Sequence, residues 1–216
     1  MNGIAVFDFD DTVIRGDSVT AMIFYARKKG VLSAGELLAC GFHGLLYRLR
    51  LSDALTAKAY AHRFLKRMPA DERLRFLREF ARLLTNRAYP EALREIQRYH
   101  AAGMHAVLCS ASCECYMRFV AENLRADALL CTPCDPDGTV RGPNCRGEEK
   151  VRRLDRWLAE NGMSRNCLAA GYGDSKGDIP MLLICGKATL VNPSNHLRRR
   201  LPSAETVRWK EQQIKT

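Results

Sequence analysis

The stretch IAVFDFDDT, Ile4 to Thr12, decides the fold, because an apolar run ends there in three carboxylates. Ile4 to Phe7 contains no polar side chain, which is typical of a strand buried on both faces of a parallel sheet. Asp8, Asp10 and Asp11 then place like charges side by side. Converging carboxylates repel and raise each other's pKa, so a bound cation is the simplest way to keep them ionised.

Further short apolar runs have the same appearance and are predicted strands. They are Ala106–Cys109, Leu129–Cys131, Leu168–Tyr172 and Ala188–Val191. Helical spacing alternates with them; Pro90 suits a first helical turn, and Gly103 suits the end of that helix. This alternation predicts an α/β fold with a doubly wound, mostly parallel sheet.

Residues 16–88 break the alternation, because they show helical spacing throughout and no convincing strand. We therefore expect an α/β core made of residues 1–15 and 89–216, with residues 16–88 inserted as an all-helical unit. The polar tail after Pro202 is expected to be loosely ordered.

Composition narrows the class of protein. The chain has 216 residues, 47% of them apolar and 27% charged, which is ordinary for a globular protein. No apolar run approaches the roughly 18 residues of a membrane span, and the N-terminus lacks the pattern of a secretory signal. Nine cysteines, an odd number, are read as reduced thiols. A cytoplasmic location is therefore expected.

Polar groups gather where the predicted strands end. Ser110 follows the second strand, Asp174 follows Gly173, and Lys150 opens a predicted helix. Ligands of open α/β sheets bind outside the carboxyl ends of the strands, so these groups and the first carboxylates should form one site. All-oxygen ligation favours Mg²⁺, whereas a hydroxyl, an amine and helix N-termini suit a phosphate. The inventory therefore predicts a phosphate ester and magnesium.

The order of these elements resembles the haloacid dehalogenase superfamily. Its pattern is DxDx[TV], a Ser or Thr, a Lys and a GD(x)nD element, here given by Asp8–Thr12, Ser110, Lys150 and Gly173–Asp178. The helical insertion resembles the C1 cap of the phosphoserine-phosphatase-like branch, subfamily IB. The resemblance implies a Rossmann-like core and a phosphatase, a phosphoric monoester hydrolase that passes through an aspartyl-phosphate.

The resemblance also implies catalytic roles. Asp8 would be the nucleophile and Asp10 the general acid and base, whereas dehalogenases and P-type ATPases lack a carboxyl at the second position. Mg²⁺ would be held by Asp8, the backbone carbonyl of Asp10 and Asp174. The alternative for Asp10 to Thr12 taken alone is a helix-capping turn.

The remaining matched residues would surround this centre. Ser110 and Lys150 would bind the phosphoryl group, and Thr12 would orient the first loop beside it. Asp178 would support the metal ligands without binding the metal itself. Asp11 is expected to be solvated.

The substrate is less determined. In phosphoserine phosphatases an acidic residue and a cap arginine grip the amino acid, and Asp17 and Arg63 are the candidates here, although Arg63 is out of register. A small phosphoserine-like metabolite is the first candidate. A lipid phosphate, such as phosphatidylglycerophosphate, is the second, because the apolar segment Leu37–Arg50 is too short to span a bilayer but suits an interface. Packing of this segment inside the cap is its alternative.

The net charge of +10 also bears on which binding partners suit the protein. Residues 16–90 contain 14 Lys or Arg and 6 Asp or Glu, so most of the excess lies in the predicted cap. A small anionic phosphate ester and an anionic membrane surface both suit this charge, as does a merely solvated basic surface. A polyanion-binding protein is a further alternative, but no nucleic-acid motif is recognised and no specific nucleic acid is expected.

Overall fold

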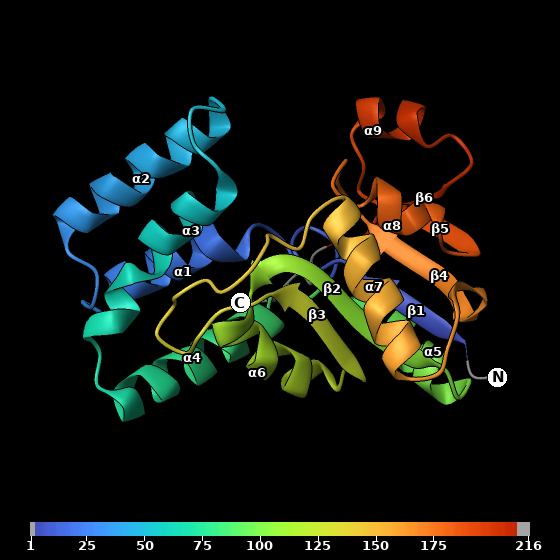
Figure 1. The fold of residues 1–216 in the computed structure, drawn as a ribbon, viewed down its shortest axis with the longest axis horizontal. Coiled ribbons are helices and arrows are strands. Elements are labelled where there is room, and N and C mark those ends of the chain that lie inside the picture. The colour runs from blue at the N-terminus through green and yellow to red at the C-terminus, as the bar shows by residue number, and fades with distance from the viewer. Residues whose placement is uncertain (1–2, 211–216) are drawn as a thin grey trace.

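The computed structural model describes residues 3–210. The strands are β1 (Ile4–Phe7), β2 (His105–Cys113), β3 (Ala128–Thr132), β4 (Leu168–Gly173), β5 (Lys187–Val191) and β6 (Glu205–Val207). They form one sheet in the order β3-β2-β1-β4-β5-β6, and every neighbouring pair is parallel. The predicted α/β class and parallel sheet are confirmed (Figure 1).

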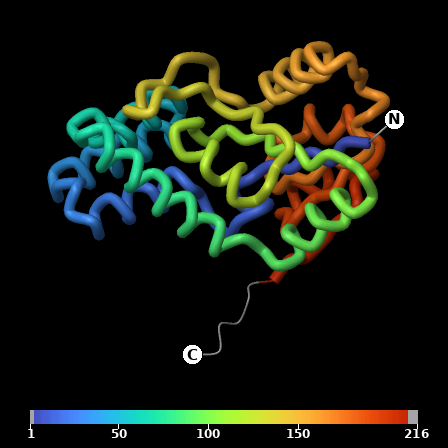
Figure 2. Tube along the Cα trace, turned by 90° about the horizontal axis from the view of Figure 1, so that it is seen from below, coloured from blue at the N-terminus to red at the C-terminus, as the bar shows by residue number. Residues whose placement is uncertain are grey.

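The helices fall into two groups. Four lie within residues 16–88: α1 (Ser18–Lys28), α2 (Ala34–Arg48), α3 (Ala54–His62) and α4 (Ala70–Thr85), with a 3-10 turn at Arg63–Arg67. The others alternate with the strands: α5 (Pro90–Ala101), α6 (Glu114–Leu124), α7 (Glu148–Glu160), α8 (Ile179–Leu183) and α9 (Asn195–Arg200), with a 3-10 turn at Arg165–Cys167. Figure 2 shows α1 to α3 at one end of the molecule and the sheet at the other.

Helices cover both faces of the sheet. Ala5 and Phe7 belong to the cluster that contains the apolar residues of α5 and α6, whereas Ile4 and Val6 belong to the cluster with α7, α8 and α9. Because successive side chains of a strand point to opposite faces, a strand covered on both sides must be apolar throughout. This is why β1 contains no polar residue before Asp8.

The helical insertion is joined to the sheet by two adjacent linkers. The backbone N–H of Tyr89 donates to the carbonyl of Val13 at 2.9 Å, and the N–H of Arg15 donates to Arg87 at 3.2 Å. The chain thus leaves the core and returns to it through a short antiparallel pair. We use the name cap for residues 16–88, which lie between these linkers.

The expectation of a loose tail after Pro202 is wrong for residues up to 210. Glu205–Val207 forms β6 beside β5, and the Trp209 indole stacks near Tyr172 with 5.9 Å between ring centroids. A run of three residues with polar neighbours is too short for its hydrophobic pattern to predict a strand. Only the pairing of these residues with β5 shows that they form one. Residues 211–216 lie outside the described part of the chain.

No helix within residues 3–210 is long and apolar enough to cross a membrane.

Candidate active site

The carboxyl ends of β1, β2 and β4 meet at one edge of the sheet. Asp8 follows β1, Ser110 lies near the end of β2, and Asp174 follows β4. Lys150 enters from the first turn of α7. Because parallel strands start and end at common edges, residues far apart in sequence come together here.

Lys150 is the cation at the centre of this site. Its side chain is 1% exposed, and its amine donates to Asp8 Oδ1 at 2.5 Å and to Asp178 Oδ1 at 2.6 Å. Burial lowers the pKa of Lys150, but the charges of Asp178 and Asp8 raise it by more, so the pKa lies well above its ordinary value. The lysine is therefore held as an ammonium at the strand ends.

Asp178 positions Lys150. Its second oxygen, Oδ2, accepts from the Ser175 backbone N–H at 3.0 Å and from the Ser175 hydroxyl at 2.8 Å. A Cβ on Gly173 would lie 2.6 Å from the Cβ of Asp178, so this close approach requires glycine. Both oxygens of Asp178 are thus engaged within the protein.

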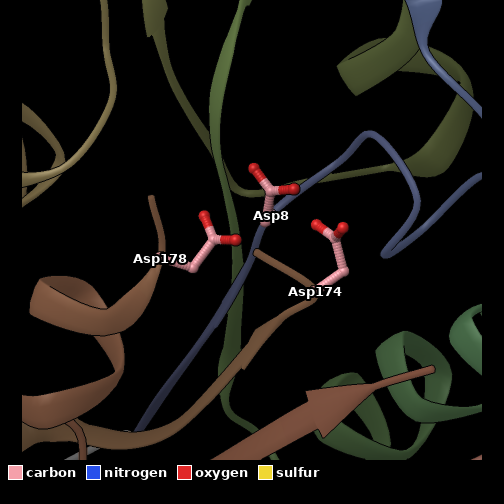
Figure 3. Close-up of side chains that lie close together, drawn as sticks. All are labelled: Asp8, Asp174 and Asp178. Atoms are coloured by element: carbon pink, nitrogen blue, oxygen red, sulfur yellow. The ribbon is translucent and has the colours of Figure 1, made fainter. Parts of the chain in front are cut away.

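Three carboxylates converge beside the amine, and Figure 3 shows the side chains of Asp8, Asp174 and Asp178 facing a common space. Their ligand oxygens lie within 4.8 Å of one another. Burial and the charges of Asp8 and Asp178 raise the pKa of Asp174 to about 8. Burial and Asp178 also raise the pKa of Asp8, against the opposing effect of Lys150. One ammonium is too little charge for three carboxylates, of which Asp8 and Asp178 are buried and Asp174 is half-buried. Their oxygen atoms fit a hard cation.

Asp10 is held apart from this cluster. Its Oδ2 accepts from the hydroxyls of Ser112 at 2.6 Å and Ser18 at 3.1 Å, and its Oδ1 accepts from the Ser18 backbone N–H at 2.8 Å. Burial and the charge of Asp17 raise the pKa of Asp10 to about 6, against the lowering effect of these hydrogen bonds. A carboxyl with this pKa can both donate and accept a proton near neutral pH.

Sequence reasoning missed the two serines that hold Asp10. The Ser18 hydroxyl lies 2.7 Å from the Ser112 hydroxyl and 2.9 Å from the Tyr116 hydroxyl. Ser112 stands two residues after Ser110, which was a usable signal, because alternate strand residues share a face. Ser18 gave no such signal, since Asp17 is the residue that caps α1.

The first loop supplies Thr12 and Asp11. The buried Thr12 hydroxyl donates to Asp174 Oδ1 at 3.4 Å, so it joins the loop to the end of β4. Asp11 is exposed, has φ +53°, and accepts from the Gly16 backbone N–H at 2.7 Å. Its carboxylate therefore shapes the turn. Ser110 is buried, and its hydroxyl accepts from the Ser112 backbone N–H at 3.1 Å.

A cavity of about 490 Å³ lies between the cap and these strand ends. Its floor carries the carboxylates and Lys150, whereas Val19, Ile23 and Ala57 line it from the cap. Arg48 and Arg146 add positive charge. The cavity thus has a polar, charged floor and a wall that is partly apolar.

The cap itself reaches the core through Lys58. This buried amine donates to the backbone carbonyl of Ala111 and to Asn144 Oδ1. Burial lowers the pKa of Lys58. Ala111 follows Ser110 directly in β2, so the cap touches the end of the strand that carries the proposed phosphate ligand. In sequence, nothing distinguishes Lys58 from a surface lysine.

The two substrate residues suggested by the sequence lie in different places. Asp17 lines the cavity while its Oδ1 accepts from the Thr20 backbone N–H at 2.6 Å. Arg63 is exposed, does not line the cavity, and stacks over the Tyr60 ring at 5.6 Å. Arg63 is five residues beyond Lys58, about 140° around a helix, and so faces away from the cavity.

Comparison with known proteins agrees with this geometry. Residues 5–183 match the family model described as haloacid dehalogenase-like hydrolase, and the chain belongs to that family. It is 29% identical over 212 residues to a protein named histidinol-phosphatase from Neisseria meningitidis serogroup C (strain 8013), covering 92% of this chain and 94% of the relative. The family and the named relatives make the protein a hydrolase of the phosphatase type.

Solved structures share the fold. A protein of unknown function from Bordetella pertussis Tohama I superposes with a TM-score of 0.87 at 22% identity, covering 96% of this chain and 99% of the other. A substrate-bound phosphoserine phosphatase superposes with a TM-score of 0.68 at 15% identity, covering 96% and 93%. The resemblance to the phosphoserine-phosphatase-like branch therefore extends to the fold.

Proposed function

We propose that the protein is a Mg²⁺-dependent phosphomonoesterase that works through an aspartyl-phosphate on Asp8. The observation that carries this is the position of the Lys150 ammonium between Asp8 and Asp178, beside Asp174 and at the floor of the cavity. An ester phosphate placed there meets a carboxylate nucleophile and an ammonium together. Positive charge beside the nucleophile reduces the repulsion between two anions.

The reaction divides into two displacements. Asp8 Oδ attacks phosphorus, the bond from phosphorus to the ester oxygen breaks, and protonated Asp10 gives its proton to the leaving alkoxide. Ionised Asp10 then takes a proton from water as that water attacks the aspartyl-phosphate, which releases phosphate and restores Asp8. A pKa of Asp10 near 6 suits both steps, because neither protonation state is rare near neutral pH.

Mg²⁺ fits the donor set that these residues offer. Asp8, Asp174 and the backbone carbonyl of Asp10 would hold it, and when bound it would neutralise phosphoryl charge. Asp178 would support the centre indirectly, because Lys150 and Ser175 occupy its two oxygens. Ser110 and Lys150 would grip the phosphoryl oxygens, with Thr12 orienting the loop beside them.

We propose a small phosphate ester of an amino alcohol as substrate. Asp17 offers a carboxylate to an ammonium at the cavity wall, and Val19 and Ile23 offer apolar contact to a ring or alkyl group. Recognition of a substrate carboxylate by Arg63 loses support, because Arg63 faces away from the cavity. The relative named histidinol-phosphatase points to the same kind of ester.

The test is release of phosphate from histidinol phosphate, phosphoserine and an aryl phosphate, with and without Mg²⁺. We expect Mg²⁺-dependent turnover of all three, highest kcat/KM for histidinol phosphate, and complete loss in Asp8→Asn. Asp17→Asn keeps the helix cap but should raise KM for the amino esters only. Turnover by Asp8→Asn would refute the mechanism, whereas a preference for phosphoserine would refute only the substrate.

We also infer that residues 16–88 act as a mobile cap on a core of residues 1–15 and 89–216. The linkers at Val13–Arg15 and Arg87–Tyr89 suit a hinge, since they run side by side as a short antiparallel pair where the chain leaves and re-enters the core. A cytoplasmic location is proposed as well, because none of the nine cysteines forms a disulfide.

A further inference from the structure

The outward side of α2 carries a row of exposed apolar side chains. Leu38, Phe42, Leu45 and Leu49 are 75%, 58%, 53% and 57% exposed. Their spacing places them on one side of a helix, within an arc of about 60° at 100° per residue. We call these four residues the apolar ridge. A surface helix normally turns its polar side to water, whereas α2 turns an apolar side to water.

The opposite side of α2 already has its partners. Cys40, Gly44 and Tyr47 line the cavity, and the His43 ring stacks on Tyr60 with 3.4 Å between centroids. Figure 1 shows α2 at the edge of the cap farthest from the sheet, with α3 between it and the core. No element within residues 3–210 covers the apolar ridge.

Positive charge accompanies the ridge. Residues 33–68, which contain α2 and α3, include six Lys or Arg and two Asp or Glu, a formal net charge of +4. One acid, Glu36, is paired with Arg67 at 2.5 Å, and the other, Asp53, caps α3. Arg50 lies between the exposed Leu49 and Leu51, at the end of the ridge. Lys58 faces the core and Arg48 lines the cavity, so Arg50 is the basic residue at the ridge itself. An apolar stripe that ends at a basic residue, on a segment of net positive charge, complements an anionic lipid surface.

We propose that the apolar ridge docks the cap onto an anionic lipid bilayer. The side chains of the ridge would enter the boundary between headgroups and acyl chains, and Arg50 would remain among the anionic headgroups. A second copy of this chain is a poorer occupant, because two-fold pairing of α2 would bring the two basic segments together. The ridge faces away from the cavity, so docking goes beyond the proposed phosphatase and leaves its chemistry free.

The experiment is co-sedimentation of the full chain with vesicles. One preparation contains equal parts of phosphatidylglycerol and phosphatidylcholine, and the other contains phosphatidylcholine alone. We expect binding to the anionic vesicles, weakened by added salt, and little binding to the neutral ones. Phe42→Ser combined with Leu45→Ser should lower partitioning roughly tenfold or more, because two large apolar side chains no longer leave water.

Two matched variants sharpen the result. Leu183→Ser alters an equally exposed leucine, at 64%, on α8 of the core, and should bind vesicles as the wild type does. Arg50→Gln removes charge alone and should weaken only the binding to anionic vesicles. Hydrolysis of a soluble aryl phosphate by each variant shows separately that the fold and the active site are intact.

The proposal is overturned if the wild-type chain binds neither vesicle, or if the ridge variant binds as strongly as Leu183→Ser. It is also overturned if the chain forms a dimer that Phe42→Ser and Leu45→Ser dissolve while vesicles are ignored. If the ridge variant fails to fold, Arg50→Gln and the salt dependence decide, and salt-independent binding contradicts docking to an anionic surface. If the wild-type chain has no phosphatase activity, the proposed function is refuted but the docking is not.

Discussion

The Lys150 ammonium lies 2.6 Å from Asp178 Oδ1 and 2.5 Å from Asp8 Oδ1, so one cation joins the helix α7 to the end of β1 and to the residue that precedes α8. Asp178 is fixed in turn by Ser175. This arrangement places the charge that we propose to bind phosphate in a buried position where water does not screen it. It also concentrates three acids around one base, and this imbalance underlies the first two predictions.

Lys150→Met should abolish activity and destabilise the protein. Without the ammonium, buried carboxylates lose their partner, so we expect kcat/KM to fall at least ~1,000-fold and stability to fall by about 3 kcal/mol without Mg²⁺. Steady-state kinetics and urea unfolding measure the two effects. Lys28→Met, at an exposed position of α1, is the control and should change neither. Activity close to wild type in Lys150→Met would contradict the assignment.

Stabilisation by Mg²⁺ should grow with pH. Asp174 has a pKa of about 8 in the folded chain, above the unfolded value of about 4, so the folded state binds more protons between these values. Without metal, stability therefore falls as the pH rises from about 4 to about 8. Mg²⁺ competes with those protons, so its effect on Tm should be small at about pH 5 and several degrees at about pH 8.

Asp174→Asn is the matched variant for this measurement. It removes one carboxylate without changing size, so the metal-free variant should be more stable than the wild type near pH 8. Its Tm should respond little to Mg²⁺. An equal Mg²⁺ response at both pH values, or an unchanged response in the variant, would exclude Asp174 as a ligand.

Asp10→Asn should separate the two chemical steps. An aryl leaving group needs little protonation, so the variant should still form the aspartyl-phosphate from an aryl phosphate and release about one phenolate per enzyme. Hydrolysis of that intermediate should then be slowed roughly 100-fold or more, because the base is gone. Stopped-flow absorbance records the burst. Asp8→Asn should show none, and steady turnover by Asp10→Asn without a burst would argue against the proton-transfer role.

Gly138→Ala should weaken the contact between cap and core. Gly138 lies in the hairpin that pairs Cys134 with Val140, has φ +85°, and a Cβ there would lie 2.7 Å from the Cβ of His62. Gly30→Ala has a similar φ of +74° but no atom within 4 Å, so it reports the backbone cost alone. We expect Gly138→Ala to cost about 1–3 kcal/mol more than Gly30→Ala in urea unfolding. An equal loss of stability in the two variants would show that His62 moves aside without a cost in free energy.

Much of the α/β core could be predicted from the sequence, because short apolar runs and the residues that end them are local features. Apolar runs such as Ile4–Phe7 predict buried strands, and β5 at Lys187–Val191 contains the predicted Ala188–Val191. The strand β6 was missed, since three residues between polar neighbours resemble a loop until they pair with β5. Arg63 was suggested as a substrate ligand because of its place in the cap sequence. The sequence did not reveal that rotation along the helix turns its side chain towards Tyr60 and solvent.

The apolar segment Leu37–Arg50 shows the limit most clearly. Composition allowed both burial inside the cap and exposure at a lipid surface. Only the rotation of α2 on α3 decides that Cys40 faces inward while Leu38 and Leu45 face water. Such rotation depends on which neighbouring helices are present, and a single helix cannot supply that information.

By itself, the sequence determined the chemistry that the strand ends can offer, because Asp8, Asp10, Lys150 and Asp174 are fixed by type and order beside their apolar runs. The tertiary structure decided how those groups divide their work. Asp10 turns to Ser18 and Ser112, whereas Asp8 and Asp178 share Lys150. Hydrogen-bond partners and burial depend on distances between segments remote in sequence. The pKa of each carboxyl follows from those distances, and so does its proposed role.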